Sequence, residues 1–219
     1  MEVKAAIRGR RSIRDFRPEP VPRELLETIL QAAIHAPSNS NRQPWEYLVI
    51  TGARLEELKS ALAQAMKQGV SPGRELKTWD EAWPMPAEGN RRAGELMAGL
   101  VESAGKAGIK PAEFVSGNFR FFNAPCVILV LMDKGYGYGA LVSVGAGIEN
   151  LLLCAYDLGL GSCWMMMPLQ YGEVFRRRFG APESSYLVSV IALGYPTDSE
   201  INRFKSSRDS LEKVAKYYP

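Results

Sequence analysis

The chain has 219 residues, and its 46% hydrophobic and 23% charged residues are the composition of an ordinary globular protein rather than a disordered one. The net charge is +3, yet residues 1–17 alone carry six basic and two acidic side chains, so the excess is confined to the N-terminus. A nucleic-acid-binding face needs basic residues spread along a groove. The charge distribution therefore argues against a nucleic-acid partner and favours one small anion held at one place.

Cysteine and histidine are scarce in this chain. The three cysteines lie far apart without a CxxC pair, which predicts reduced thiols and, with no secretion signal, a cytoplasmic location. No apolar run approaches the roughly 18 residues that span a bilayer, so we expect no membrane association. The single histidine, His35, rules out a multi-histidine metal site, and no metal is assigned. We interpret His35 as structural.

Hydrophobic periodicity predicts helices and strands in alternation along the chain. Helices are expected at residues 1–9, 20–37, 53–68, 139–159 and 171–180, the first ended by Gly9 and the second begun near Pro22. Buried strands are expected at residues 46–51, 126–132 and 186–194, which are short, apolar and rich in β-branched residues. This order predicts an α+β (α/β layered) fold in a single domain, residues 1–219.

Residues 69–118 differ from the rest, because they begin with a stretch rich in Gly, Pro, Trp and Met and continue with a helical pattern at 93–108. We interpret them as an insertion between strands. Long excursions of this kind serve as lids or binding loops, and a helical embellishment packed on the core or on a partner subunit is an equal alternative. The candidates for lining an acceptor pocket are Trp79, Trp83, Met85 and Phe114.

The densest charge lies in RGRRSIRDFRPEPVP, residues 8–22. An arginine guanidinium never loses its proton, and its planar fork of donors matches phosphate oxygens. Arg10, Arg11 and Arg14, with the Ser12 hydroxyl, can therefore surround a phosphate monoester. The alternative is a solvated basic turn that pairs with surface carboxylates.

Four motifs, taken together, resemble the flavin-dependent nitroreductase family. They are RRSIRDF near the N-terminus, PSNSNRQPW after the second helix, GLGSCW after a long helix, and ALGYP followed by a basic segment and SLEKV. The likeness covers nearly the whole chain and is weakest at 69–118. It implies a nitroreductase-like central sheet flanked by helices, with a helical insertion at about 69–118.

The resemblance also implies a set of contacts to FMN. It assigns the phosphate or ribityl contacts to Arg10, Arg11, Ser12, Lys205 and Arg208, and places Arg14 near the flavin pyrimidine. A loop of the partner subunit reaches the flavin through Pro37, Ser38 and Asn39, with Asn41 and Gln43 in support. A cationic contact falls on Arg120, with Asn118 nearby.

The turn after GLGSCW departs from the family pattern. The family commonly places a small, glycine-containing turn there, whose backbone N–H groups face the flavin N5 and O4 atoms. This chain has Met165, Met166, Met167 and Pro168 instead. We expect main-chain donors at Met166 and Met167 to take that role, and the alternative is three methionines buried in the core.

The resemblance implies that the protein is an NAD(P)H-dependent flavin oxidoreductase. NADH or NADPH gives a hydride to flavin N5, leaves, and is replaced in the same cavity by a flat, electron-poor acceptor such as a nitroaromatic or a quinone. No side chain is assigned as nucleophile or general acid. The active form is expected to be a homodimer with the flavin at the subunit interface.

Two rival interpretations remain open at this stage. The protein is a flavin-binding sensor or storage protein without turnover if the methionine turn has removed catalysis. It is a Rossmann NAD-dependent dehydrogenase if GYGYGA, residues 135–140, is a dinucleotide fingerprint. Against the second, the motif lies in mid-chain and no βαβ unit precedes it.

Overall fold

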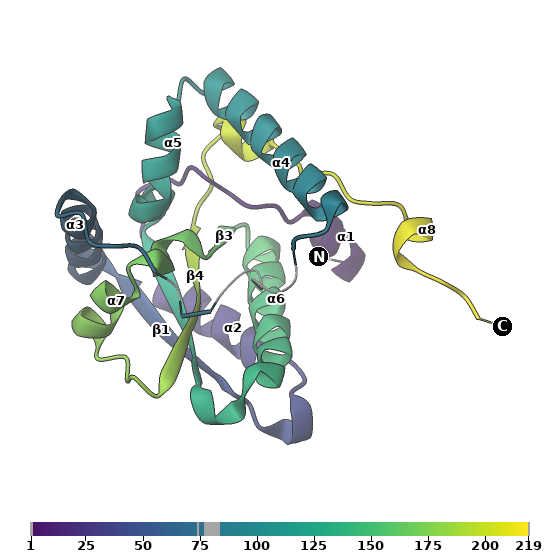
Figure 1. Cartoon of the computed structure of the whole chain (residues 1–219), viewed down its shortest axis with the longest axis horizontal. Helices are drawn as coiled ribbons and strands as arrows, with labels where there is room; N and C mark the ends of the chain where they lie inside the picture. The colour runs from purple at the N-terminus through teal and green to yellow at the C-terminus, as the bar shows by residue number, and fades with distance from the viewer. Residues whose placement is uncertain (1, 74, 77–83, 219) are drawn as a thin grey trace.

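The computed structural model describes residues 2–73, 75–76 and 84–218, and within them the centre of the molecule is a four-stranded antiparallel sheet (Figure 1). In space the strands follow the order β1-β2-β4-β3. Helices cover both faces, which confirms the predicted α+β class. The strands are β1 (Trp45–Thr51), β2 (Cys126–Asp133), β3 (Gly161–Met165) and β4 (Ser185–Gly194).

Strand β2 lies at the heart of the core. From Cys126 to Met132 every residue is at most 1% exposed, as expected for an unbroken apolar run with cover on both faces. Alternate side chains serve the two faces, because successive residues of a strand point in opposite directions. Val127 and Leu129 join the cluster on one face, and Ile128 and Val130 join the cluster on the other.

The predicted helices form, four of them shorter than expected, whereas the one expected at 53–68 is shifted by one residue. Helices α2 (Arg23–Ile34) and α6 (Leu141–Asp157) pack against one face of the sheet, and α3 (Gly52–Lys67) and α7 (Gly172–Phe179) against the other. Helix α1 (Val3–Gly9) packs beside α6. His35 follows α2 directly and is exposed.

Two helices occupy the described part of the 69–118 region, α4 (Ala87–Lys106) and α5 (Pro111–Gly117), at the top of Figure 1. Helix α4 packs on the turn Glu200–Arg203 near the C-terminus. Trp79 and Trp83 lie outside the described residues. Phe114 is only 9% exposed and its ring centroid lies 6.2 Å from that of Phe122, so it is a core residue and does not line a pocket.

The strand β3 was not predicted. The sequence GSCWM begins with two small residues and has only five positions, too few for a periodic signal. Its place in the sheet comes from pairing, since Gly161 to Met165 lie opposite Gly194 to Val190 of β4. The antiparallel register also removes the Rossmann alternative, because that fold needs parallel neighbours. The GYGYGA stretch forms two short 3-10 turns, Lys134–Tyr136 and Tyr138–Ala140.

The arginine-rich segment extends the edge of the sheet. Ser12 forms a parallel bridge with Ser162, and the Ile13 N–H donates to the Ser162 carbonyl at 2.9 Å. Further along, Arg17 donates its N–H to the Tyr195 carbonyl at 2.9 Å. At Gly161 an added Cβ would lie 2.7 Å from Ile13 Cγ1, so glycine permits this close approach.

One stretch of the described chain, Tyr138–Asp157, is long and apolar enough to cross a membrane by composition, with a hydropathy of 1.4. The sequence alone did not single it out. Its side chains Val144, Ile148 and Leu151 are fully buried under the sheet. These three apolar residues of α6 therefore belong to the core of the molecule.

Candidate functional site

Six basic side chains from the two ends of the chain meet around one cavity of about 500 Å³. Three short segments build it: the end of α1 with the extended segment after it, the middle of α4, and the chain that follows Arg203. None of its lining residues is acidic. Its lining residues are Ile7, Arg8, Gly9, Arg10, Arg11, Ser12, Arg14, Leu96, Phe204, Lys205, Ser206 and Arg208.

Carboxylates neutralise little of this charge. Among the ion pairs of the described residues, the cluster contributes one, between Arg10 Nε and Glu149 Oε1 at 3.3 Å. That contact lacks hydrogen-bond alignment, and Arg10 Nε is a buried atom with no hydrogen-bond partner. Arg208 Nη1 donates only to its own turn, to Ser206 Oγ at 2.7 Å and the Ser207 carbonyl at 2.9 Å. The donors left over fit a dianion such as a phosphate monoester.

Arg11 differs from the other arginines, because its Nε donates to the Asn202 carbonyl at 2.6 Å. It borders a second cavity of about 330 Å³ on the opposite side of the segment, which Arg17 also lines. In an extended segment successive side chains point to opposite sides. This places Arg14 at the first cavity and Arg17 at the second, with Arg10 and Arg11 lining both.

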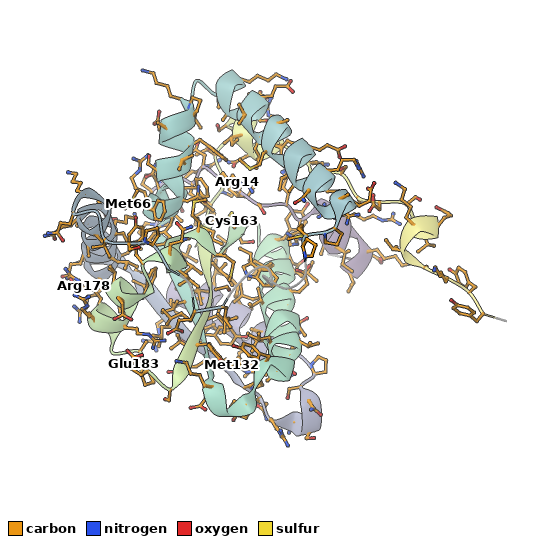
Figure 2. The ribbon with its side chains drawn as sticks, in the orientation of Figure 1. Arg14, Met66, Met132, Cys163, Arg178 and Glu183 are labelled. Atoms are coloured by element: carbon orange, nitrogen blue, oxygen red, sulfur yellow. The ribbon has the colours of Figure 1, made fainter. Side chains whose placement is uncertain are left out.

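Arg14 and Ser12 lie beside Cys163 of β3, and Figure 2 shows Arg14 and Cys163 close together. Burial raises the pKa of the Cys163 thiol, although the Arg14 charge and a hydrogen bond with Ser12 act in the opposite direction. The thiol therefore stays protonated near neutral pH, and Cys163 is packed in the core at 3% exposure. It is not an activated nucleophile.

The methionine turn divides between core and surface. Met165 is 4% exposed and belongs to the core, whereas Met166 and Met167 are half-buried. Met166 lines a cavity of about 170 Å³ together with residues of the 70–76 segment. That segment is held to the turn by the Gly73 N–H, which donates to the Gln170 carbonyl at 2.9 Å. The alternative of three buried methionines holds for Met165 alone.

The loop with Pro37, Ser38 and Asn39 is exposed and locally held. The Asn39 N–H donates to Ser143 Oγ at 3.3 Å, and the Gln43 N–H donates to Ser38 Oγ at 3.0 Å. Left-handed backbone conformations, with φ of 52°, 52° and 47°, occur at Ser40, Asn41 and Gln43. Such conformations cost energy in residues other than glycine and concentrate in ligand-binding loops.

Within one chain this loop and the arginine segment lie at different ends of α6. The loop touches Ser143 at the start of the helix, and Gly9 packs on Tyr156 near its end. Thirteen helical residues separate these points, a distance of about 20 Å. The structure therefore does not bring Pro37 to Asn41 together with the arginines of the same chain.

Arg120 and Asn118 also lie apart from the arginine cavity. Asn118 Nδ2 donates to the carbonyls of Phe114 at 3.3 Å and Val115 at 3.2 Å, which ends helix α5. Arg120 is exposed in the turn that follows. Neither residue lines the cavity. Their flavin contacts stay predictions.

Sequence reasoning missed seven residues of the cavity region, among them Arg8, Leu96, Phe204 and Asn202. Arg8, Leu96 and Phe204 line the cavity, and the buried Asn202 contacts the arginine segment from behind. Arg8 belongs to the basic run, but no contact to the cofactor was predicted for it from the sequence. Leu96 and Phe204 carry no local signal, because only the tertiary fold brings α4 and the C-terminal segment together.

These observations define an α+β protein in which the two ends of the chain form one cavity lined by six cations. The sequence model of the nitroreductase family matches residues 7–195. The chain therefore belongs to the nitroreductase family, as the four motifs predicted. Among curated relatives, a chloronitrobenzene nitroreductase from Comamonas testosteroni is 30% identical over 96% of this chain and 94% of its own length. A 4-nitrobenzoate reductase from Nocardioides sp. is 31% identical over 87% and 79%.

Solved structures agree with the fold. The FMN- and NADPH-dependent nitroreductase NfnB from Sphigopyxis sp. strain HMH has a TM-score of 0.92 and 27% identity, with both chains fully covered. The FMN-dependent NfnB from Mycobacterium smegmatis, solved with NADPH, has a TM-score of 0.89 and 26% identity over 99% of this chain and 97% of its own. The predicted nitroreductase-like fold is thus confirmed.

Proposed function

We propose that this protein is an FMN-dependent oxidoreductase that passes a hydride from NADH or NADPH to a flat, electron-poor aromatic acceptor, such as a nitroaromatic or a quinone. The observation that carries the proposal is the cavity in which six cations meet without a carboxylate lining it. The names of the relatives support it, since they are reductases of chloronitrobenzene and 4-nitrobenzoate. The similar NfnB structures are FMN-dependent enzymes, one of them solved with NADPH.

The residues at the cavity fit a flavin phosphate. The buried Arg10 Nε, which has no hydrogen-bond partner, and the surrounding guanidinium groups offer donors for a dianion. Arg10, Ser12 and Arg208 hold the phosphate, and each charge-assisted hydrogen bond contributes about 1.5–3 kcal/mol. Lys205 adds a point charge from the same C-terminal segment, and Arg11 contributes the nitrogens that it does not use on Asn202.

FMN, when bound, supplies a centre at N5 that accepts and then donates a hydride. Arg14, which lines the cavity, would stabilise negative charge on the pyrimidine edge of the flavin through its fixed positive charge. Two opposite charges about 4 Å apart interact by about 4 kcal/mol at an effective dielectric near 20. The main-chain N–H groups of Met166 and Met167, in the turn after β3, would donate to the flavin when it is bound. No side chain of this chain is assigned as a nucleophile or a general acid.

We further propose a homodimer with the flavin at the subunit interface. The loop of Pro37 to Asn41 reaches the flavin of the partner subunit, which resolves its separation from the arginine cavity along α6. The outer face of α6 supports this arrangement, because the apolar side chain of Val142 is 79% exposed there. The tail after α8 (Leu211–Val214) also extends away from the body of the molecule (Figure 1).

Three further predictions from the sequence, on domain organisation, the insertion and location, accompany this proposal. The chain functions as one domain, residues 1–219, with residues 69–118 as an insertion that covers the acceptor site. Leu96 of α4 lies at the arginine cavity, which supports a role of this region near the cofactor. The location is cytoplasmic, in agreement with three free cysteines in the structure.

Turnover is tested by the visible spectrum of the purified protein. We expect a yellow protein that bleaches when NADH or NADPH is added without air and recolours when a nitroaromatic acceptor follows. A protein that stays yellow with both donors is a flavin sensor or store, and this result overturns the enzymatic proposal. A colourless protein that does not take up FMN overturns the cofactor assignment.

The phosphate assignment is tested by Arg10→Ala combined with Arg208→Ala. We expect this double variant to lose FMN and to keep its fold by circular dichroism. The matched control, Arg23→Ala with Arg54→Ala, removes the same charge from two exposed ion pairs far from the cavity and should keep FMN. Full FMN occupancy in the first double variant would refute the assignment.

The dimer is tested by measuring the mass of the protein in solution by light scattering. We expect two chains in the wild type, and a shift to one chain with less bound FMN in Val142→Glu. The control Val101→Glu introduces the same charge on α4, where the side chain is 49% exposed, and should leave the dimer intact. A monomeric wild type that still reduces acceptors would exclude the dimer proposal.

A further inference from the structure

A buried asparagine joins the two ends of the chain at the arginine cavity. Asn202 is 3% exposed and lies in the turn Glu200–Arg203, three residues before Lys205. Its contacts do not stay within its own turn. They reach Arg11, Arg14 and Asp15, which are 187 to 191 residues away in sequence.

The hydrogen bonds of Asn202 use the whole side-chain amide. Oδ1 accepts from the Arg14 N–H at 2.8 Å, and Nδ2 donates to the Asp15 carbonyl at 2.7 Å and the Thr197 carbonyl at 3.1 Å. The Asn202 main-chain carbonyl accepts from Arg11 Nε at 2.6 Å. A buried amide with every partner in place holds its neighbours rigidly, because breaking one bond leaves a polar group unsatisfied.

Neighbouring bonds strengthen the same connection. Thr197 donates its hydroxyl to Asp15 Oδ2 at 2.5 Å, and its N–H donates to the Asp15 carbonyl at 3.2 Å. Asn202 Nδ2 also lies 3.3 Å from Thr197 Oγ1. The backbone of residues 14–15 is thereby tied to that of residues 197–202. Thr197 and Asn202 do not line the cavity of six cations, but they line the second cavity beside Arg10 and Arg11.

We infer that Asn202 is a positioning residue that sets the distance between the two halves of the phosphate clamp, the N-terminal arginines and the Lys205–Arg208 segment. Asn202 does not line the larger cavity that these cations share. It acts through the backbone of Arg14 and the side chain of Arg11. This inference rests on the proposed function, since it assigns a purpose to the same phosphate site.

Asparagine suits this position because its side chain offers both an acceptor, Oδ1, and a donor, Nδ2. Aspartate has the same shape and keeps an acceptor for the Arg14 N–H, but its second oxygen would face the carbonyls of Asp15 and Thr197. Asn202→Asp is therefore expected to push the two segments apart. Asn202→Ala removes all of the side-chain bonds and leaves the segments untied.

The test compares FMN with riboflavin, which lacks the phosphate, because their ratio of affinities isolates the phosphate site from the ring site. Two charge-assisted bonds to the phosphate predict that the wild type prefers FMN by about 100-fold or more. Asn202→Ala and Asn202→Asp are each expected to lower this ratio at least about tenfold, with the riboflavin affinity nearly unchanged. Both affinities are measured by quenching of flavin fluorescence on titration into apoprotein.

A control variant separates a change in the ratio of FMN to riboflavin affinity from a general loss of stability. Leu58→Ala, at a fully buried position of α3 away from the cavity, is the control that destabilises the fold and should keep the wild-type ratio. Thr197→Val weakens the same tie by removing the bond to Asp15 and the longer contact with Asn202 Nδ2, but it leaves the Asn202 side chain in place. It should therefore lower the ratio by a smaller factor. It provides the measurement if an Asn202 variant does not fold.

The outcomes separate the inference from the function on which it rests. A wild type that binds FMN and riboflavin equally well refutes the phosphate site itself. A wild type that prefers FMN, with Asn202 and Thr197 variants that keep the full preference, refutes the positioning role alone. Equal losses of FMN and riboflavin affinity in the Asn202 variants also refute it, because a general structural role predicts that pattern.

Discussion

A buried ion pair next to the methionine turn permits a quantitative prediction for stability. The Arg176 side chain is 4% exposed, and its Nη2 lies 2.5 Å from Oε1 of Glu75, which is 32% exposed. The pair fastens the segment before residue 77 to α7 and to β4. Glu75 Oε2 also accepts from the Leu187 N–H at 3.4 Å, on the part of β4 that extends beyond β3. We predict that Glu75→Gln, which keeps the shape and removes the charge, destabilises the protein by about 2 kcal/mol.

The magnitude follows from what remains around Arg176 after the change. Removing one partner of a buried pair costs about 3–5 kcal/mol when the other charge is left unsolvated. Here the guanidinium keeps its bonds to the carbonyls of Pro182 at 2.5 Å and Ser185 at 2.7 Å. Two exposed carboxylates, Glu173 and Glu183, also remain 3.9 Å from its Nε. These partners reduce the expected loss to about 2 kcal/mol, which corresponds to about 4–8 °C in Tm for a chain of this size.

The assay is urea unfolding followed by circular dichroism, at one chain concentration because the stability of a dimer depends on concentration. Hydrogen exchange adds a local measurement, since the amides of Gly73 and Leu187 should exchange faster in Glu75→Gln. The control is Glu57→Gln, which breaks exposed pairs with Arg54 at 3.2 Å and Arg178 at 3.7 Å. It should change the free energy of unfolding by less than about 0.5 kcal/mol. If the two variants are equally stable, the argument from burial is wrong.

Three further predictions concern the sheet edge, the thiols and the tail. Gly161→Ala places a Cβ 2.7 Å from Ile13 Cγ1 and should displace the arginine segment from β3. We expect the free energy of unfolding to fall by about 1–3 kcal/mol and FMN to bind more weakly. The control Gly94→Ala, which has open space around its Cβ, should change neither quantity. Cys126 and Cys163 are buried and Cys154 is half-buried, so Ellman's reagent at pH 8 should modify only Cys154 in the native protein and all three cysteines in denaturant. Burial raises the pKa of the Cys126 thiol to about 12. The unfolded thiol ionises near 9.0, so the stability that neutral Cys126 contributes should be lost as pH rises from 9.0 towards 12, and Cys126→Ala should flatten this fall in urea midpoints. Asp209→Asn removes the carboxylate that pairs with Arg92 and lies 4.0 Å from Arg91, and trypsin should then cleave the C-terminal tail faster, which a gel of the digest would reveal or contradict.

The parts of the fold that were predictable from the sequence have strong local signals. Strand β2 is an unbroken apolar run, and helix α2 repeats apolar residues on one face, so their burial on folding is dictated locally. Strand β3 could not be predicted in this way. Its five residues acquire strand geometry from pairing with β4 on one side and from the contact of Ser162 with the arginine segment on the other. Both partners are distant in sequence.

The candidate site likewise has residues that the sequence predicts and residues that only the fold reveals. The arginines could be identified from the sequence as binding residues, because few structural roles need so many cations in one short segment. Asn202 gives no such signal, since an asparagine in a polar turn is common and only the fold reveals that it is 3% exposed. The loop from Pro37 to Asn41 is an intermediate case. Its polar composition suggested a binding loop, but its separation from the arginine cavity along α6 is visible only in the structure.

The arginine cavity also connects cofactor binding with the stability of the chain ends. Cations that share a cavity repel one another. Glu149, which pairs with Arg10 and is the one carboxylate among the described residues that pairs with this cluster, is 42% exposed and so offsets little of this repulsion. The fold must hold the two ends together against this force, and the buried bonds of Asn202 and Thr197 do so. A bound dianion replaces repulsion with attraction and stabilises only the folded state. FMN binding should therefore slow the release of the N-terminal and C-terminal segments together, because they separate through the same set of contacts.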